Sequence, residues 1–213
     1  MKVSVSYLNS KDICNDLRKL DLCSNEFIHV DVMDGKFVNN KSLPFSEVKN
    51  IYKYTTKRLD VHLMVENPSK YIPLYCSLNS EYICFHLETD EDIFENINLI
   101  KSFGVKAGLV IKPNTKIREL VPYMPSIDLV LVMSVEPGMG GQDFIIDTES
   151  RVDELRDLIN QYNFDVLINV DGGITDKTVG FVKNSDIVTS GSYVVNSEDF
   201  EEKISSLRID SVL

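Results

Sequence analysis

The sequence lacks the features that would place the chain in or across a membrane. No run of about 18 apolar residues occurs in it, and its N-terminal residues form no apolar segment of the kind that a secretory signal requires. None of its four cysteines forms a Cys-x-x-Cys pair, so neither a zinc ribbon nor a dithiol redox motif is indicated. We therefore expect a cytoplasmic protein with reduced thiols. The cysteines are Cys14, Cys23, Cys76 and Cys84.

Basic residues are scarce as well. The chain carries 22 Lys and Arg against 33 Asp and Glu, and its formal net charge is −11 at pH 7. Nucleic acids and anionic membranes are bound through clustered basic side chains, so this balance argues against both as partners. An anionic small molecule would have to be held locally, by backbone dipoles or a metal ion, against an unfavourable overall field.

No Pro-, Gly- or Ser-rich linker divides the chain, and residues 1–213 are expected to form one domain. Short β-branched runs recur, each followed by an amphipathic polar segment. Eight such strand–helix units predict a parallel sheet closed into a (β/α)₈ barrel. The predicted strands are Val3–Ser6, Phe27–Asp31, Leu59–Leu63, Tyr82–His86, Lys106–Ile111, Leu129–Ser134, Val166–Val170 and Ile187–Ser190. Helical patterns between them include Ile13–Leu20, Asp90–Phe103 and Val152–Gln161.

Polar side chains gather near the predicted strand ends, where such barrels place their chemistry. Because side chains alternate along a strand, His29 shares a face with Asp31 on the second strand, and Asp60 shares one with His62 on the third. Asp171 follows the seventh strand. Ordinary hydrogen-bonded polar residues are the alternative, but two His/Asp pairs on adjacent strands favour a metal site. The set His29, Asp31, His62 and Asp171 suits Zn²⁺, Fe²⁺, Mn²⁺ or Co²⁺.

Other side chains near these ends are interpreted differently. We expect Asp60 to lie too deep in the barrel to reach the metal, and His86 to support or pack against the site rather than bind the ion. Three methionines also fall at strand ends, and methionine is usually a core residue. The functional alternative is an apolar cap over a reacting centre. These methionines are Met33, Met64 and Met133.

Glycine-rich loops follow the last three predicted strands. Loops after the late strands of a barrel frequently bind phosphate through exposed backbone N–H groups, and glycine permits close approach. One glycine pair would be a weak signal because turns use glycine routinely, but three in succession favour a phosphate site. The loops contain Gly138, Gly140, Gly141, Gln142, Gly172, Gly173, Gly191 and Ser192.

Taken in order, these motifs resemble the ribulose-phosphate 3-epimerase family. The resemblance runs from about residue 2 to residue 208 and rests on five segments considered together. They are residues 29–35 (HVDVMDG), 60–65 (DVHLMV), 133–142 (MSVEPGMGGQ), 170–174 (VDGGI) and 190–192 (SGS). The combination is far more specific than any single glycine pair.

The resemblance implies a reaction and a role for each matching residue. The reaction would be 3-epimerisation of D-ribulose 5-phosphate to D-xylulose 5-phosphate through an enediolate, with one divalent metal ion. His29, Asp31, His62 and Asp171 would be the metal ligands, and the two aspartates would also exchange the C3 proton. Ser6 would contact the substrate together with the two histidines, Met33, Met64 and Met133 would cap the intermediate, and the glycine loops, with Gln142 and Ser192, would hold phosphate.

The chain departs from the family pattern at several positions. Lys36 and Asn39 replace a histidine and a proline in the loop after the second strand, which is the expected lid over the substrate. Val5 replaces a proline, Asn169 a glutamate, and Tyr193 a small residue. No proposed ligand is lost. We also expect a homo-oligomer.

Three other functions are the alternatives. The first is the same reaction on a hexulose phosphate, as in the allulose-phosphate epimerases. The second is a barrel decarboxylase or lyase, but those that resemble this family use Asp-x-Lys-x-x-Asp, and residues 60–65 contain no lysine. The third is a catalytically silent sugar-phosphate sensor, which predicts loss of an acid/base residue, whereas Asp31 and Asp171 are both present.

Overall fold

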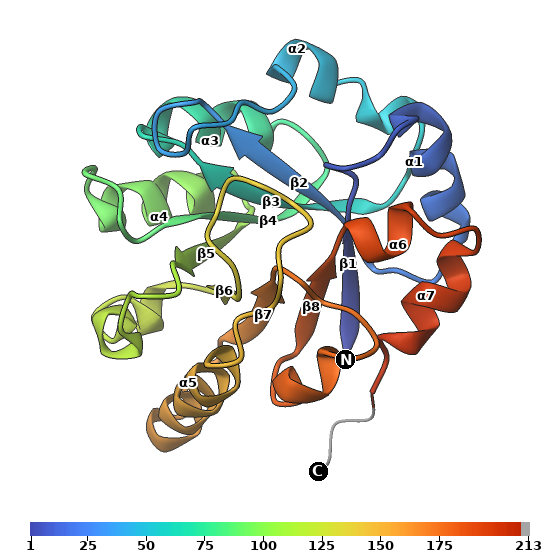
Figure 1. Ribbon diagram of the computed structural model, residues 1–213. Helices are drawn as coiled ribbons and strands as arrows, with labels where there is room; N and C mark the ends of the chain where they lie inside the picture. The colour runs from blue at the N-terminus through green and yellow to red at the C-terminus, as the bar shows by residue number, and fades with distance from the viewer. Residues whose placement is uncertain (210–213) are drawn as a thin grey trace.

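The computed structural model describes residues 1–209, so the last four residues of the predicted domain lie outside the described part. Eight parallel strands pair in chain order and close into a barrel, with β8 beside β1 (Figure 1). The predicted fold class is therefore confirmed. The strands are β1 (Lys2–Ser6), β2 (Phe27–Met33), β3 (Arg58–Met64), β4 (Ser80–His86), β5 (Lys106–Ile111), β6 (Leu129–Met133), β7 (Leu167–Asp171) and β8 (Ile187–Ser190).

The register of β2 and β3 brings the two His/Asp pairs together. These strands pair residue for residue over their whole length, with His29 opposite Asp60 and Asp31 opposite His62. The second strand continues to Met33, two residues beyond its predicted end. His29 and His62 therefore lie within their strands and face the barrel interior, where the backbone holds them firmly.

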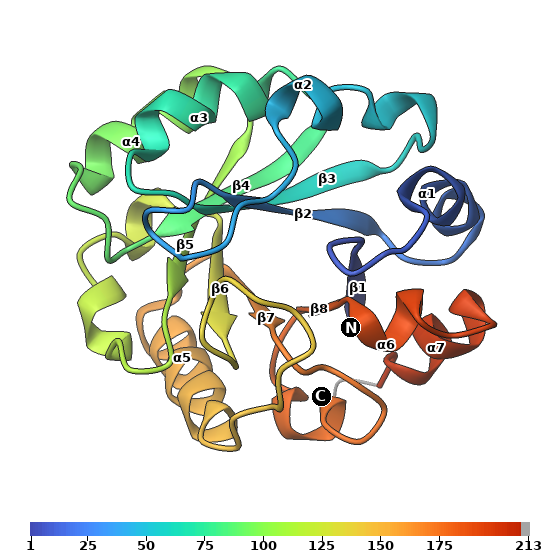
Figure 2. The ribbon, with the colours of Figure 1, turned by 45° about the horizontal axis from the view of Figure 1, so that its top comes forward.

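Helices of unequal length cover the outside of the barrel (Figure 2). The α-helices are α1 (Ile13–Leu22), α2 (Phe45–Val48), α3 (Pro68–Cys76), α4 (Ile93–Ser102), α5 (Thr148–Tyr162), α6 (Ser192–Val195) and α7 (Phe200–Ser206). The 3₁₀ turns are η1 (Ile51–Lys53), η2 (Ile117–Leu120), η3 (Met124–Ser126) and η4 (Val179–Val182). Helix α4 begins three residues after its predicted start because the Asp92 side chain caps it, accepting from the Glu95 N–H at 2.9 Å.

Two connections carry only 3₁₀ turns between their strands. The connection from β5 to β6 contains Pro113, Pro122 and Pro125, and proline inside a helix removes a backbone hydrogen bond. The connection from β7 to β8 spans only residues 172–186. Among residues 1–209, no helix is long and apolar enough to cross a membrane.

A polar layer lies inside the barrel beneath the strand ends. Its centre is the buried carboxylate of Asp60, whose Oδ2 accepts from Ser4 Oγ at 3.0 Å and Asn169 Nδ2 at 3.1 Å. The same oxygen lies 2.9 Å from His29 Nδ1. Asp60 Oδ2 thus holds His29 from below, whereas Asp60 Oδ1 is buried without a hydrogen-bond partner among the described residues.

Candidate active site

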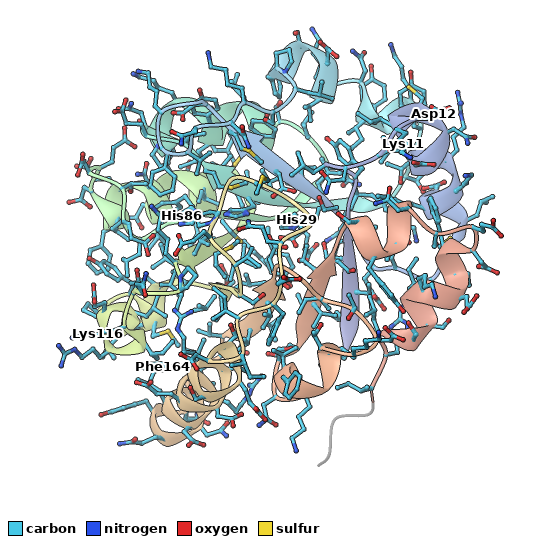
Figure 3. All side chains as sticks on the ribbon, in the orientation of Figure 1. Lys11, Asp12, His29, His86, Lys116 and Phe164 are labelled. Atoms are coloured by element: carbon cyan, nitrogen blue, oxygen red, sulfur yellow. The ribbon has the colours of Figure 1, made fainter. Side chains whose placement is uncertain are left out.

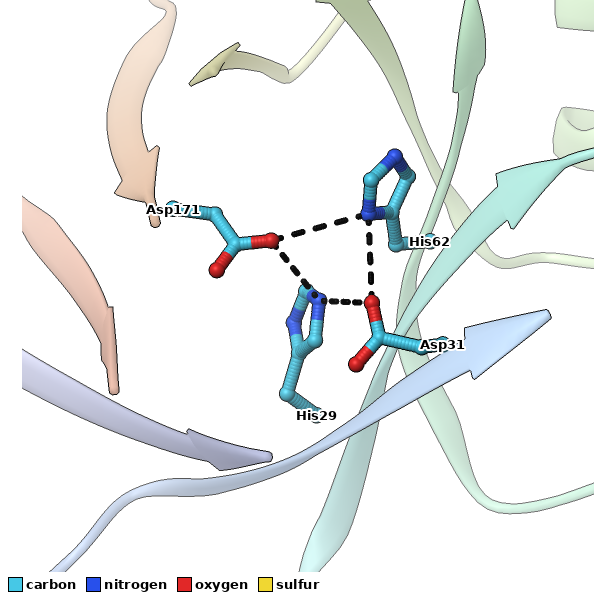
Figure 4. A group of neighbouring side chains, drawn as sticks. All are labelled: His29, Asp31, His62 and Asp171. Atoms are coloured by element: carbon cyan, nitrogen blue, oxygen red, sulfur yellow. Dashed lines mark ion pairs between the residues drawn. The ribbon is translucent and has the colours of Figure 1, made fainter. Parts of the chain in front are cut away.

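Four side chains meet where β2, β3 and β7 open onto the top of the barrel (Figure 4). His29 Nε2 lies 3.5 Å from Asp31 Oδ1 and 3.6 Å from Asp171 Oδ2. His62 Nδ1 lies 3.5 Å and 3.6 Å from the same two oxygens. One atom from each residue lies within 4.8 Å of the others, so the structure brings together the four predicted ligands.

These separations suit a shared cation better than direct hydrogen bonds. Hydrogen bonds between nitrogen and oxygen are usually 2.7–3.2 Å long, whereas the four neighbouring distances here are 3.5–3.6 Å. The four atoms all lie within 4.8 Å of one another, close enough to share one ion. His29 Nε2 and His62 Nδ1 are also buried without a hydrogen-bond partner. Two such orphaned nitrogens facing two carboxylates are what a divalent metal would satisfy.

The inner nitrogen of His29 is oriented by the acid beneath it. An ionised carboxylate can only accept, so His29 Nδ1 donates to Asp60 and Nε2 presents its lone pair to the cluster. Burial lowers the pKa of His29, but the carboxylates of Asp60 and Asp31 outweigh burial and leave this pKa well above its usual value. Without a cation, the cluster attracts a proton, which indicates how strongly it favours positive charge.

His62 is oriented through a second histidine. His62 Nε2 lies 2.9 Å from His86 Nε2, and His86 Nδ1 lies 3.0 Å from Glu88 Oε2. Burial lowers the pKa of His86 to about 4, so its ring is neutral and donates its one hydrogen to Glu88. His86 Nε2 then accepts from His62 Nε2, which leaves the His62 Nδ1 lone pair for the cluster.

Glu88 is the last residue in this series of contacts from His62 through His86. It accepts from the Lys112 N–H at 2.8 Å and from the Thr115 hydroxyl. Burial raises its pKa, but hydrogen bonds from His86 and Thr115 outweigh burial and lower the pKa to about 2. In Figure 3, His29 and His86 lie over the middle of the barrel, while Lys116 projects from its edge. His86 thus contacts His62, one of the predicted ligands, and is not itself a member of the cluster.

The two aspartates reach the cluster from strands that are separated by β8 and β1. Ser6 Oγ donates to Asp31 Oδ2 at 2.7 Å, so one oxygen of Asp31 is fixed by β1 while the other faces the histidines. Burial raises the pKa of Asp31, but the His29 and His62 imidazoles outweigh it and hold the pKa below its usual value. Asp31 is therefore ionised at neutral pH.

A cavity of about 490 Å³ opens above the cluster. Met33 and Met64 are opposite each other in the β2–β3 register and form a small apolar group with Val38. Met133 lines the same cavity, although it packs mainly with the apolar residues inside the barrel. The three predicted methionines thus give the cavity an apolar wall beside the ionisable cluster.

The predicted glycine loops line the opposite part of this cavity. At Gly173, with a φ of +61°, a Cβ atom would lie 2.7 Å from the Phe144 backbone nitrogen, so a side chain is excluded. At Gly141, with a φ of +77°, the nearest atoms to such a Cβ are 3.6 Å and 3.8 Å away, so the absent side chain leaves room in the cavity. Gln142 Nε2 donates to the Glu136 and Met139 carbonyls, each at 2.7 Å, and shapes its own loop. The loops contain Gly138, Gly140, Gly141, Gln142, Gly172, Gly173, Gly191 and Ser192.

The loop after β2 is fastened to the loop after β6. Asn40 Nδ2 donates to the Gly138 carbonyl at 2.8 Å, and a Cβ atom at Gly138 would lie 2.8 Å from Val38 Cβ. These contacts join the expected lid to the first glycine loop. Lys36, in the same loop, has its Nζ 3.3 Å from Glu66 Oε2.

The cavity is also lined by side chains outside the predicted set. Asn9, in the loop after β1, lies against Gly140 and Ser192, and Lys177 lines the cavity with an exposed side chain. A single asparagine or lysine in a loop is a common turn or surface residue, so neither carries a signal by itself. Only the closing of the barrel brings Asn9 beside residues 131 and 183 positions later in the chain.

The chain is similar to a known protein family and to named relatives over most of its length. Residues 1–195 match the model of the ribulose-phosphate 3 epimerase family. The ribulose-phosphate 3-epimerase of Helicobacter pylori J99 is 37% identical over 211 residues, which cover 98% of this chain and 97% of the relative. The enzyme of the same name from Bacillus subtilis 168 is 34% identical over 213 residues, which cover 98% of each chain.

Solved structures with low identity share the fold. A 3-hexulose-6-phosphate synthase superposes with a TM-score of 0.71 at 11% identity, covering 97% of this chain and 98% of the other. The N-(5'-phosphoribosyl)anthranilate isomerase of Pyrococcus furiosus gives 0.61 at 15% identity, covering 97% and 96%. At such identities the likeness concerns the barrel alone.

Proposed function

The chain belongs to the ribulose-phosphate 3-epimerase family, and on that premise we propose that it converts D-ribulose 5-phosphate to D-xylulose 5-phosphate by a metal-dependent transfer between two bases. The observation that carries the proposal is the pair Asp31 and Asp171. Their carboxylates approach one buried cluster from strands on different sides of the cavity. A planar intermediate lying between them would have one carboxylate at each face.

The two aspartates divide the proton transfer. Asp31, ionised because its pKa is lowered, is ready to remove the C3 proton of one epimer. Asp171, carrying a proton, delivers it to the opposite face of the enediolate, and the reverse reaction exchanges the two roles. The pair must hold different protonation states, which is the usual arrangement where two carboxyl groups share a site. Ser6 keeps Asp31 aimed by holding its second oxygen.

The ligand set fits one divalent ion, held by His29, Asp31, His62 and Asp171. When bound, such an ion supplies positive charge that lowers the cost of negative charge developing on the substrate oxygens. Asp60 and His86 would keep both ring nitrogens aimed at it. The identity of the ion is left open between Zn²⁺, Fe²⁺, Mn²⁺ and Co²⁺.

The remaining walls of the cavity position the sugar phosphate. Backbone N–H groups of the glycine loops hold the phosphate, which supplies binding energy remote from C3 and orients the reacting carbon. Met33, Met64 and Met133 exclude water beside C3 and offer no competing proton donor. The arrangement separates the charged anchor of the substrate from the carbon that changes configuration.

Turnover of two substrates tests the proposal. Metal-loaded enzyme should interconvert ribulose 5-phosphate and xylulose 5-phosphate, and its kcat/KM should exceed that for the allulose 6-phosphate and fructose 6-phosphate pair. A higher kcat/KM for the hexulose phosphates would assign the enzyme to the longer substrate. Absence of turnover with both pairs in metal-loaded protein would reject epimerisation.

A further inference from the structure

Asn9 occupies the junction of two glycine loops in the cavity. Its Nδ2 donates to Ser192 Oγ at 2.6 Å, across 183 positions of sequence. It also lies flat against Gly140, where an added Cβ atom would meet Asn9 Nδ2 at 2.5 Å and Oδ1 at 3.2 Å. A Cβ at Gly141 would lie 3.8 Å from the same nitrogen. The Asn9 amide therefore faces the open space between the loop after β6 and the start of α6.

Gly140 provides a second observation about the position of the Asn9 amide. Gly138, Gly141, Gly172 and Gly173 all have positive φ angles, which favour glycine for conformational reasons. Gly140 has no such angle, and the obstacle to a side chain there is the Asn9 amide. A side chain at position 140 would therefore require the Asn9 amide to shift.

The hydrogen-bond pattern leaves two donors of these cavity-lining residues without an acceptor among the described residues. An asparagine amide carries two N–H groups, and one of them is used on Ser192 Oγ. Because that hydroxyl already accepts from Asn9, its own O–H is free to donate elsewhere. Donation to Ser192 polarises the hydroxyl and strengthens the bond that it makes next.

Charge makes neutral donors valuable at this position. The chain has a net charge of −11, and the glycine loops at 138–142, 172–173 and 191–192 contain no basic residue. Lys177, the basic side chain that lines the cavity, is exposed to solvent, where screening weakens its pull. Side-chain N–H and O–H groups would complete the set of backbone N–H donors around an anion.

We propose that Asn9 and Ser192 form a donor pair that binds the phosphate group of the substrate, with Asn9 as a substrate-binding residue in addition to the glycine loops. The inference rests on the proposed function, because it takes the glycine loops to be the phosphate site. One Asn9 N–H and the Ser192 O–H donate to phosphate oxygens. The second Asn9 N–H donates to Ser192 Oγ and holds the two side chains together. The ligand class is a sugar that ends in a phosphate monoester.

The test compares phosphate binding and turnover in metal-loaded enzyme. Asn9→Ala should raise the dissociation constant for inorganic phosphate, measured by calorimetry, by about 10-fold or more, because hydrogen bonds to charged groups are among the stronger ones. The dissociation constant should rise further in Asn9→Asp, which has the same shape but places a second anion beside the phosphate. For ribulose 5-phosphate, kcat/KM should fall by at least the same factor, while metal content stays constant. Asn184→Ala, at the other end of the barrel where Asn184 bonds Asp153 at 2.7 Å, is the matched control.

A second variant separates ligand binding from packing. Gly140→Ala should raise the phosphate dissociation constant in the wild-type background and change it little in Asn9→Ala, because the displaced amide is already gone. Unchanged phosphate binding in both Asn9 variants would overturn the inference. If the wild type binds phosphate but does not turn over ribulose 5-phosphate, the proposed function fails, and the phosphate titration of Asn9→Ala still decides the role of Asn9.

Discussion

The two ends of the cavity are built in different ways. At the cluster end, His29 and His62 are fully buried, lie within strands, and each has its second nitrogen held by another side chain. At the proposed phosphate end, Gly140 and Gly141 are exposed and belong to a loop that one hydrogen bond from Asn40 joins to the loop after β2. The contrast shows where rigidity is needed. Proton transfer and metal binding depend on positions fixed to a fraction of an ångström, whereas an anion can be held by adaptable backbone donors.

This difference separates two kinds of defect. Changes at the cluster end should alter metal affinity or the chemical step. Changes at the phosphate end should alter substrate binding and leave the metal in place. If metal binding and substrate binding are separate in this way, each variant should change one and leave the other unaltered, with effects that decrease from the catalytic aspartates to the lid.

The largest effect is expected from removing a single base. Asp171→Asn and Asp31→Asn keep an oxygen that can remain near the ion but cannot accept the C3 proton. Turnover of ribulose 5-phosphate should fall by at least about 10²–10⁴-fold, the usual worth of general acid–base catalysis. Metal content should be measured in the same samples. Asp165→Asn, an exposed change just before β7, is the control, and near-normal turnover of a metal-bound Asp171→Asn enzyme would contradict the two-base scheme.

A smaller effect is expected beneath the ligands. His86→Leu removes the acceptor that directs His62 Nε2, so the metal affinity should fall by about 10–100-fold in competition with a chelator. His86→Gln can both accept from His62 and donate to Glu88, and it should recover part of the loss. Equal metal affinity in the wild type and in His86→Leu would show that the contacts from His62 through His86 to Glu88 do not orient the His62 ring.

At the phosphate end, Gly141→Val should raise KM by about 10-fold or more, because its side chain enters the anion space and disfavours the positive φ there. Metal content should not change. Gly104→Val is a matched control, since Gly104 also has a positive φ of 74° but lies after α4, with no atom within 4 Å of the added Cβ. A larger rise in KM from Lys177→Ala would assign the phosphate to a side chain instead.

The smallest effect is expected from removing the hydrogen bond that joins the loop after β2, the expected lid, to the loop after β6. Asn40→Ala removes one neutral hydrogen bond to Gly138, so KM should rise by about 2–10-fold, with no change in metal content. Asn39→Ala, an exposed neighbour in the same loop, should leave KM unchanged. A loss of metal in Asn40→Ala would show that the two ends of the cavity are coupled.

Most of the barrel and of its cluster could be predicted from the sequence, for a physical reason. A strand repeats every two residues, so the spacing of His29 and Asp31 alone places both on one face. The same repeat places Asp60 deeper in the barrel than His62. It does not fix the register that sets Asp31 opposite His62, because neighbouring strands can pair in more than one register.

Other parts could not be predicted because they depend on tertiary contacts. The link from His62 through His86 to Glu88 depends on the rotamers of rings on adjacent strands. The position of Asn9 depends on two loops that meet only when the barrel closes. Resemblance to a family indicates that the glycine loops matter, but it does not indicate which side chain each glycine accommodates.

The central claim is that Asp31 and Asp171 act on opposite faces of C3, and isotope exchange tests it most directly. Ribulose 5-phosphate should be equilibrated with the wild-type enzyme in D₂O, and C3 of both epimers examined by NMR or mass spectrometry. Because one carboxyl removes the proton and another delivers one that has exchanged with solvent, the xylulose 5-phosphate formed should carry deuterium at C3, with little of the original hydrogen retained. Product formed without solvent deuterium at C3 would contradict the account and indicate a hydride transfer or a carbon–carbon cleavage route.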